Sequence, residues 1–466
     1  MKQISKLLTG LLLLAATASH AQHMHHPMPS KTDTTAGKPA PAPLQHKHMD
    51  TGGMDTGHNM QMPGMQHNMT HAYSLSLPMN RNGSGTSWQP DATPMYAYMH
   101  HGKTMWNFML HGNIFLRQTW VNFNNDYKRG GTKFDAPNWL MGMAQKQVGK
   151  NGLLNFELML SLDPLTTGGN GYPLLFQSGE SWKGRPLTDR QHPHDLFSGV
   201  GVGYTQRINK DMDISGYIGY PGEPALGPTA FMHRISSISN PDAPISHHWQ
   251  DATHISFGVG TLGFRYKWLK AEGSIFTGRE PDEERYGFDR PRFDSYSWRL
   301  NANPSKNFAV QVSQGYIYSP EALHPEENVT RTTASVIYSE RLNKNLFLNS
   351  TLAWGMNDAG SDHREHSVLL ESNAAWLKNM LYLRYEFVQK SPEELDLEVW
   401  PYMHKAEPVH AFTLGYSRTL ITYLKTDLAL GGQLSLYQPS AALETLYGTT
   451  PLSAQMYLRI TPSMMR

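Results

Sequence analysis

The chain has no cysteine and almost no net charge, and each absence excludes a class of protein. Without cysteine, neither a disulfide framework nor a lipid-modified lipoprotein terminus can form. The 40 Lys and Arg residues nearly balance the 39 Asp and Glu residues, so no basic field favours nucleic acid as a partner. Long apolar runs are also missing. The apolar run at residues 7–16 is too short to span a membrane as a helix, and no second run follows it.

The first 21 residues have the pattern of a secretory signal peptide. Lys2 and Lys6 supply the positive charge, residues 7–16 form the apolar stretch, and Ser19-His20-Ala21 matches a small-x-small cleavage site. We therefore expect residues 1–21 to be removed and the mature protein to be exported.

Residues 22–71 form a low-complexity tail with eight histidines and eight methionines. The tail has almost no branched aliphatic residues, cannot bury a core, and is predicted to be disordered. Thioether sulfur is a soft ligand that selects Cu(I) or Ag(I), whereas imidazole also binds Cu(II), Zn or Ni. A methionine outside a core is unusual, which favours metal capture; a polar linker without a role is the alternative. The candidate ligands are Met60, Met62, Met65, His67 and Met69.

From residue 104 onward, after a linker at 72–103, apolar and polar side chains alternate with a period of two. Trp106, Phe108 and Leu110 alternate with Asn107 and Met109, and the same pattern recurs at residues 154–163 and 381–387. One apolar and one polar face on long strands is typical of a transmembrane β-barrel with lipid outside and water within. A soluble sandwich also alternates, but its strands are usually shorter. Residues 104–466 are therefore predicted to form an all-β barrel.

The lengths of the connections between these strands predict their number. Short turns alternate with long connections along the barrel region, which indicates sixteen antiparallel strands, with fourteen or eighteen as alternatives. Such an alternation places both chain ends on the short-turn side, which is the periplasm in bacterial outer-membrane barrels. We expect the protein to lie in the lipid of the outer membrane of a Gram-negative bacterium, with its tail in the periplasm.

Two of the long connections, residues 163–194 and 220–252, lead into dense clusters of histidine. Loops of this length are usually functional or disordered. In DRQHPHDL, at residues 189–196, the proline spacer should place His192 and His194 on one side of an extended chain. In HHWQDATH, at residues 247–254, a short helix would align His247, Asp251 and His254, whereas an extended chain would align His248 with His254.

Three interpretations of these clusters compete. Imidazole and carboxylate at this spacing suit a borderline divalent ion such as Cu(II), Zn or Ni. Alternatively, arginines and aspartates of the same loops pair, and the histidines complete a hydrogen-bonded plug. A serine-histidine hydrolase is the third, but the chain has no Gly-x-Ser-x-Gly elbow, so we expect no enzyme. The candidate metal ligands are His192, His194, Asp195, His233, His247, His248, Asp251 and His254, with Met232 as a further donor.

Several motifs resemble those of a widespread bacterial family of uncharacterised outer-membrane proteins. They are DRQHPHDL at 189–196, GEPALGPTAFMHR at 222–234, HHWQDATHI at 247–255 and FTGREPDE at 276–283. The resemblance covers roughly residues 90–461; it implies a family barrel and carries no established activity.

The overall layout is also similar to that of the copper-resistance outer-membrane protein B family, which joins a Met/His-rich periplasmic region to a barrel. This similarity is one of layout and implies a role with copper, in which the tail supplies the soft ligands. The sequence therefore favours a barrel for metal binding, export or resistance, with a copper ion and periplasmic metal carriers as partners. The alternative is a general porin or a receptor for an unrelated solute, with the tail as an incidental linker.

Overall fold

The computed structural model describes residues 69–102, 104–360, 364–397 and 405–465. The chain divides into two units, residues 1–63 and 64–466, and all the described residues belong to the second. No helix among them has the length and apolar character needed to cross a membrane.

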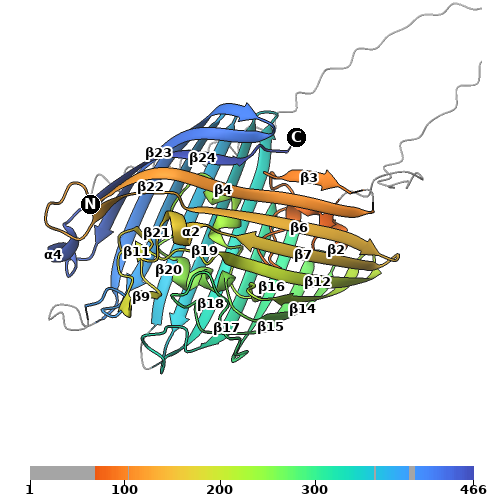
Figure 1. The fold of residues 1–466 in the computed structure, drawn as a ribbon, viewed down its shortest axis with the longest axis horizontal. Helices are drawn as coiled ribbons and strands as arrows, with labels where there is room; N and C mark the ends of the chain where they lie inside the picture. The colour runs from red at the N-terminus through yellow and green to blue at the C-terminus, as the bar shows by residue number, and fades with distance from the viewer. Residues whose placement is uncertain (1–68, 103, 361–363, 398–404, 466) are drawn as a thin grey trace, which may run out of the picture. The chain divides into compact units, whose positions relative to one another are not determined.

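Within the described residues, sixteen antiparallel strands form a closed barrel (Figure 1) and follow one another in chain order. The predicted strand number is therefore confirmed, and the predicted short turns lie at or within a few residues of the observed ones. The strands are β4 (Trp106–Val121), β6 (Asn138–Val148), β7 (Gly152–Leu160), β12 (Phe197–Asn209), β13 (Met212–Gly219), β14 (Val259–Tyr266), β15 (Leu269–Phe276), β16 (Ser295–Ser305), β17 (Phe308–Tyr318), β18 (Asn328–Asn343), β19 (Leu346–Asp358), β20 (Arg364–Trp376), β21 (Asn379–Lys390), β22 (Glu407–Tyr423), β23 (Thr426–Pro439) and β24 (Leu452–Pro462).

Strand β4 closes the barrel by pairing with the last strand, β24, on one side and with β6 on the other. Residues 114–120 of β4 pair with β24, and residues 106–114 pair with β6. Two short strands complete its edges: β3 (Tyr98–His101) lies beside residues 107–110 and β5 (Gly131–Asp135) beside residues 117–121. The first and last strands of the chain therefore seal the wall against each other.

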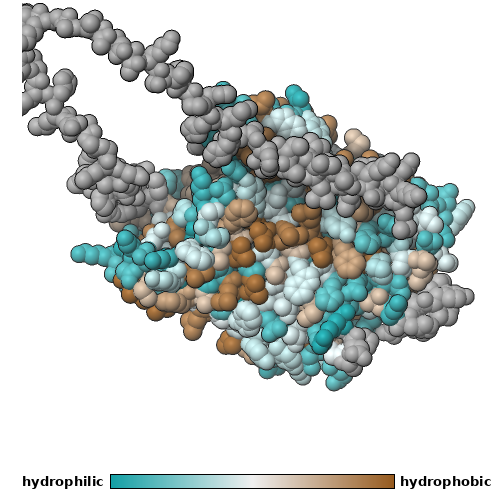
Figure 2. Space-filling view, turned by 180° about the vertical axis from the view of Figure 1, so that it is seen from behind, coloured by the Kyte–Doolittle hydropathy of each residue, from teal (hydrophilic) through white to brown (hydrophobic). Residues whose placement is uncertain are grey.

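The barrel wall is apolar outside and polar inside. Along β7, Phe156 and Leu158 are exposed, whereas Asn155 and Glu157 between them are buried. Figure 2 shows hydrophobic side chains gathered on one outer face of the wall. Because an exposed apolar wall of this extent needs lipid around it, the barrel is a transmembrane one.

Three segments lie inside the barrel or line its mouth, and they contain the short elements of the fold. The amino-terminal segment, residues 69–97, contains β1 (Thr70–His71), β2 (Ser74–Pro78) and η2 (Met79–Arg81). The first loop, residues 161–196, contains α2 (Asp163–Thr166), β8 (Tyr172–Pro173), β9 (Ser181–Trp182), β10 (Arg185–Pro186) and β11 (Arg190–Gln191). The second loop, residues 220–258, contains η3 (Phe231–His233), η4 (Ile235–Ser237), α3 (His247–Gln250) and η5 (Ala252–His254). A further short helix, α4 (Glu444–Tyr447), lies in the last long connection.

The amino-terminal segment contacts the lumen near the short turns. The Ser74 hydroxyl donates to Asp213 at the start of β13, and the side chain of Asn303 in β16 donates to the Gln89 carbonyl at 2.8 Å. Most of this segment was expected to be a linker, and the structure instead places residues 72–97 inside the barrel. Met69 is also buried there. Met60, Met62, Met65 and His67 lie outside the described residues.

Candidate metal centre

The second loop crosses the lumen and is fixed to the wall by buried ion pairs. Arg234 donates to Asp251 of the same loop at 2.6 Å and to Glu371 of β20 at 2.7 Å. Asp242 accepts from Arg117 of β4 at 2.6 Å. All of these side chains are buried, and buried charges persist only when they are paired. The lumen is therefore plugged by its own loop.

Helix α3 lies directly against the wall because a glycine leaves room for its backbone. A Cβ atom on Gly355 of β19 would lie 2.1 Å from the carbonyl oxygen of Trp249. The Trp249 ring is buried, with the Lys390 ammonium 4.2 Å from its centroid. Residues 247–250 form a short helix and not an extended chain. The Asp251 amide donates to the His247 carbonyl at 3.0 Å, which is the hydrogen bond of a helical turn.

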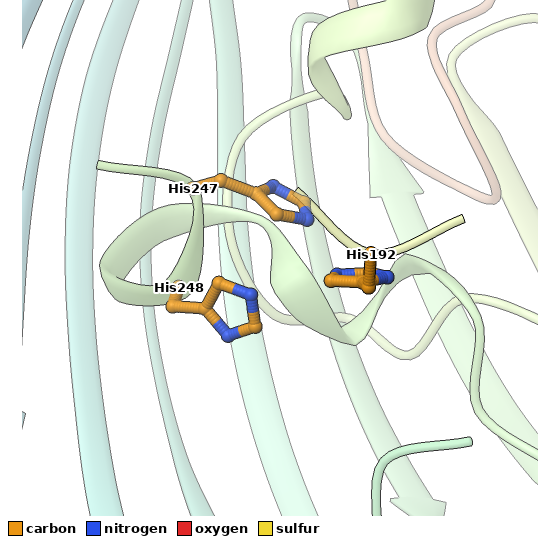
Figure 3. Close-up of side chains that lie close together, drawn as sticks. All are labelled: His192, His247 and His248. Atoms are coloured by element: carbon orange, nitrogen blue, oxygen red, sulfur yellow. The ribbon is translucent and has the colours of Figure 1, made fainter. Parts of the chain in front are cut away.

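Five histidines of the two loops meet beside α3. The ring centroids of His192 and His248 are 5.5 Å apart, and those of His247 and His248 are 5.2 Å apart. The cluster continues through His254, 5.1 Å from His247, to His194, 5.6 Å from His254. Figure 3 shows His247 and His248 on α3 facing His192 from the first loop. The sequence clusters at 189–196 and 247–254 thus form one histidine cluster of five rings.

The Nδ1 atom of each ring in the histidine cluster is held by an oxygen atom. Three of these oxygens belong to carboxylates in the two loops and one to a carboxylate in the connection after β15. Where the facing carboxylate is ionised it only accepts hydrogen bonds, so it favours the proton on Nδ1 and leaves the lone pair on Nε2. Burial raises the pKa of Glu180 to about 8, so its pair with His192 does not fix the proton in this way. The pairs are His192 with Glu180 at 3.0 Å, His194 with Asp163 at 2.9 Å, His247 with Asp251 at 2.6 Å, His248 with Glu280 at 3.2 Å, and His254 with the Asp251 carbonyl at 2.8 Å.

The opposite nitrogen, Nε2, is buried without a hydrogen-bond partner among the described residues in four of the five rings. These are His194, His247, His248 and His254. One ring nitrogen from each of His192, His247 and His248 lies within 4.8 Å of the other two. Metal-binding histidines are held in this way, with a carboxylate on one nitrogen and the ion on the other.

Burial also keeps His192, His247 and His254 neutral, as metal ligands must be. Removal from water lowers the pKa of His247 to about 4, although Asp251 opposes the shift, and it lowers the pKa of His254 to about 3. Burial and the neighbouring His248 lower the pKa of His192 as well. At neutral pH these rings therefore present a free lone pair and carry no charge that would repel a cation.

The remaining predicted ligands have other neighbours. Asp251 supports His247 and pairs with Arg234, and Asp195 lies 3.6 Å from Arg285. His233 packs against Trp139, with ring centroids 4.7 Å apart, outside the histidine cluster. The plug interpretation requires arginines and aspartates of the loops to pair, and Arg234 pairs with Asp251 in this way. The arginine beside Asp189 is Arg129, at 3.3 Å, and Arg190 donates to backbone carbonyls.

Sequence reasoning missed the supporting carboxylates Asp163, Glu180 and Glu280. Asp163 and Glu180 belong to the first loop and Glu280 to the connection after β15, and the three reach the histidines only when the loops fold into the lumen. The one available signal was the position of Glu280 within the FTGREPDE motif at residues 276–283.

An acidic vestibule leads to the histidine cluster from the long-loop side. It is a cavity of about 230 Å³ that His248 lines together with seven glutamates, and Arg331 and His324 are its basic lining residues. Burial and the neighbouring acids raise the pKa of Glu321, and burial raises the pKa of Glu180 and of Glu365 to about 8, so these three are largely protonated at neutral pH. The remaining four glutamates still outnumber the one lining arginine, and a cavity with excess negative charge concentrates cations. The seven are Glu180, Glu280, Glu321, Glu327, Glu365, Glu393 and Glu394.

A second, more open group of possible ligands lies at the rim of this vestibule. His324, Glu327 and Glu393 bring one ligand atom each within 4.8 Å of the others, and the His324 Nδ1 lies 2.7 Å from Glu393. About a third of the side-chain surface of His324 and of Glu393 is exposed. Exposure to water weakens such a group as an ion site.

A closed sixteen-strand barrel with a lipid-facing wall and a plugged lumen defines a transmembrane β-barrel of the outer-membrane type. No family model matches the chain, and no curated protein matches it by sequence. Among solved structures, it is similar to the anion-selective porin from Comamonas acidovorans, with 12% identity, a TM-score of 0.46, and coverage of 76% of this chain and 99% of that chain. It is also similar to a loop L8 deletion mutant of OmpT, an outer membrane protein of Vibrio cholerae (8% identity, TM-score 0.44, coverage 76% and 99%), and to Salmonella typhi OmpF in complex with daunomycin (9%, 0.43, 76% and 97%). These likenesses concern the barrel fold alone.

Proposed function

We propose that this protein is an outer-membrane barrel that binds a metal ion at the histidine cluster and passes it through a plugged lumen. The observation that carries the proposal is the arrangement of the five imidazoles, each held at Nδ1 and four with a buried, unpartnered Nε2. Leaving several buried polar atoms unpaired is unfavourable unless a ligand satisfies them. The imidazole set suits a borderline divalent ion, Cu(II), Zn or Ni.

Copper is the ion that the rest of the chain favours. The tail interleaves thioether and imidazole at Met60, Met62, Met65 and His67, a ligand set that takes soft copper. Many weak sites on one tail raise the local ion concentration near a pore. In this proposal the tail lies in the periplasm, where it receives copper from periplasmic metal carriers, and the barrel exports or sequesters the ion.

The alternative of a general porin agrees less well with the lumen. A porin needs a continuous aqueous channel between its two ends. Here the amino-terminal segment and the second loop both bond to lumen-facing side chains of the wall, for example Gln89 to Asn303 and Arg234 to Glu371. A plugged barrel with an acidic vestibule is better suited to selected cations than to bulk solutes.

The direct test is the metal content of the full-length protein, purified without a histidine tag from cells grown with copper. We expect at least one tightly held copper ion per chain, and we expect a strain lacking the gene to be more sensitive to copper. The proposal would be wrong if the purified protein contains no metal and also fails to take up copper after reconstitution. It would also be wrong if the deletion strain grows normally with copper and the histidine cluster binds no ion.

A glycine beside His248 gives a sharper test of the histidine cluster. A Cβ on Gly179 would lie 2.1 Å from Cε1 of the His248 ring. Gly179→Ala should therefore push His248 aside and lower the affinity for copper about 10–100-fold, as loss of a ligand's support does. The matched control is Gly184→Ala, because Gly184 also has a positive φ but has open space around its Cβ. Isothermal titration of both variants should show weakened binding for the first alone; equal affinities would mean that His248 is not a ligand.

A further inference from the structure

A second cavity inside the barrel, of about 70 Å³, is lined by six methionines. It lies between the amino-terminal segment, strands β4 and β6, and the η3–η4 stretch of the second loop. Of these strands, β4 supplies one methionine and β6 two, the amino-terminal segment two and the second loop one. The six that define this methionine chamber are Met79, Met95, Met109, Met141, Met143 and Met232.

The methionines of the wall occupy positions that a barrel normally gives to polar residues. Met109, Met141 and Met143 point inward and are at most 7% exposed, on the same face of the wall as Asn107 and Gln145. Methionine often fills gaps in a core. In this chamber, however, the thioethers surround empty space several times larger than the ~10–15 Å³ that a single water requires. The six methionines belong to one hydrophobic cluster of the interior, and within it their side chains also line an open chamber.

Two imidazoles share the chamber, and one has an unpartnered nitrogen. His111 of β4 and His233 of η3 both line it, with ring centroids 5.5 Å apart. The Nε2 atom of His111 is buried and has no hydrogen-bond partner among the described residues. A buried imidazole nitrogen in a cavity that thioethers also line makes a ligand set of soft character, with imidazole as the borderline member.

The chamber adjoins the histidine cluster through two smaller cavities. One, of about 40 Å³, is lined by Trp139 and Met232 of the chamber and by His194 of the cluster. The other, of about 30 Å³, is lined by His233 and Met141 of the chamber and by His254 of the cluster. Along the lumen, the lining thus changes from carboxylates in the vestibule to imidazoles and then to thioethers, in the direction of the amino-terminal segment.

We propose that the methionine chamber is a binding site for a soft monovalent cation, Cu(I) or Ag(I). Thioethers bind these ions in preference to Zn(II) or other harder ions, and a chamber without a charged lining residue suits a single positive charge better than two. The idea that the chamber is one stage of a metal path depends on the proposed function. The idea that it binds a metal ion depends only on its own residues, none of which belongs to the histidine cluster.

The experiment compares Ag(I) binding by the full chain with that of a triple variant, Met109→Leu, Met141→Leu and Met143→Leu. Leucine keeps nearly the same volume, so each change should alter stability by less than about 1.5 kcal/mol. We expect the triple variant to bind one Ag(I) fewer per chain in chelator-buffered titrations and to lose sulfur neighbours of silver in X-ray absorption spectra. The tail contributes equally in all variants, so the difference reports the chamber.

Two controls separate this proposal from the function above. Met456→Leu removes an exposed thioether from the outer wall and should leave Ag(I) binding unchanged. A variant with His192, His247 and His248 replaced by Asn should lose divalent-ion binding and keep the chamber's Ag(I). If a folded methionine triple variant binds as many Ag(I) ions per chain as the unmodified protein, the chamber is not an Ag(I) site, whatever the histidine cluster binds. If that variant fails to fold, His111→Leu alone should weaken Ag(I) binding at least tenfold, and unchanged binding there would equally overturn the proposal.

Discussion

Replacing Arg234 by Ala should release the plug and destabilise the barrel more than any other single change considered. Arg234 is fully buried and neutralises both Asp251 and Glu371. Removing one partner of a buried ion pair leaves an uncompensated charge and typically costs about 3–5 kcal/mol. Because the two carboxylates belong to the loop and to the wall, their mutual repulsion should push the loop out of the lumen. We expect a lower free energy of unfolding and a rise in single-channel conductance in planar bilayers.

The matched control for this change is the ion pair between Arg364 and Asp358, which joins β20 to β19 at 2.7 Å on the surface. The Arg364 side chain is 67% exposed, and exposed pairs contribute only about 0–1 kcal/mol. Arg364→Ala should therefore leave both stability and conductance nearly unchanged. If Arg234→Ala behaves like this control, the second loop is held in the lumen by packing and not by its charges.

The barrel could be predicted from sequence because its determinants are local. Phe108 and Leu110 alternate with Asn107 and Met109 in the sequence, and the structure exposes the first two and buries the second two. The short turns also show in the sequence, since Lys267 and Trp268 separate two alternating runs that become β14 and β15. Strand number follows from counting such turns, without knowledge of any long-range contact.

The amino-terminal segment could not be predicted in the same way. Residues 72–97 lack a long alternating run, so their sequence is typical of a linker. Their order comes from hydrogen bonds to lumen-facing side chains, such as Ser74 to Asp213, Thr86 to Arg299 and Thr93 to Ser339. These partners are remote in the chain, and no local pattern reveals that they meet.

The histidine cluster could be predicted from the sequence only in part. His192 and His194, and likewise His247, His248 and His254, could be named because histidine is dense in two short stretches. The carboxylates that orient these histidines could not be named from the sequence, because Glu180 and Glu280 reach His192 and His248 only through loop folding. Met109 stood in the sequence on the face assigned to the lumen, but a single methionine there is also compatible with ordinary packing.

Replacing three histidines of the cluster by Asn should abolish divalent-ion binding while the plug stays in place. The Asn amide nitrogen can occupy the position of Nδ1 and keep the hydrogen bond to the carboxylate, whereas no atom of Asn reaches the position of Nε2. In His192→Asn, His247→Asn and His248→Asn together, Glu180, Asp251 and Glu280 therefore keep a donor. We expect the affinity for Cu(II) to fall by more than about 100-fold, measured by titration of the reconstituted full chain, with little change in thermal stability.

The Gln variants at the same positions provide the complementary test, because the Gln amide occupies the position of Nε2 and leaves the carboxylate without its donor. They should destabilise the plug through unpaired buried carboxylates, at about 1–3 kcal/mol for each. His366→Asn serves as the control outside the cluster, since His366 stacks on Trp354 of the wall. If the Asn variants keep their copper, His192, His247 and His248 hold no ion. Their carboxylate pairs would then serve only to anchor one loop against the other, and the unpartnered Nε2 atoms would be a structural cost of that anchoring.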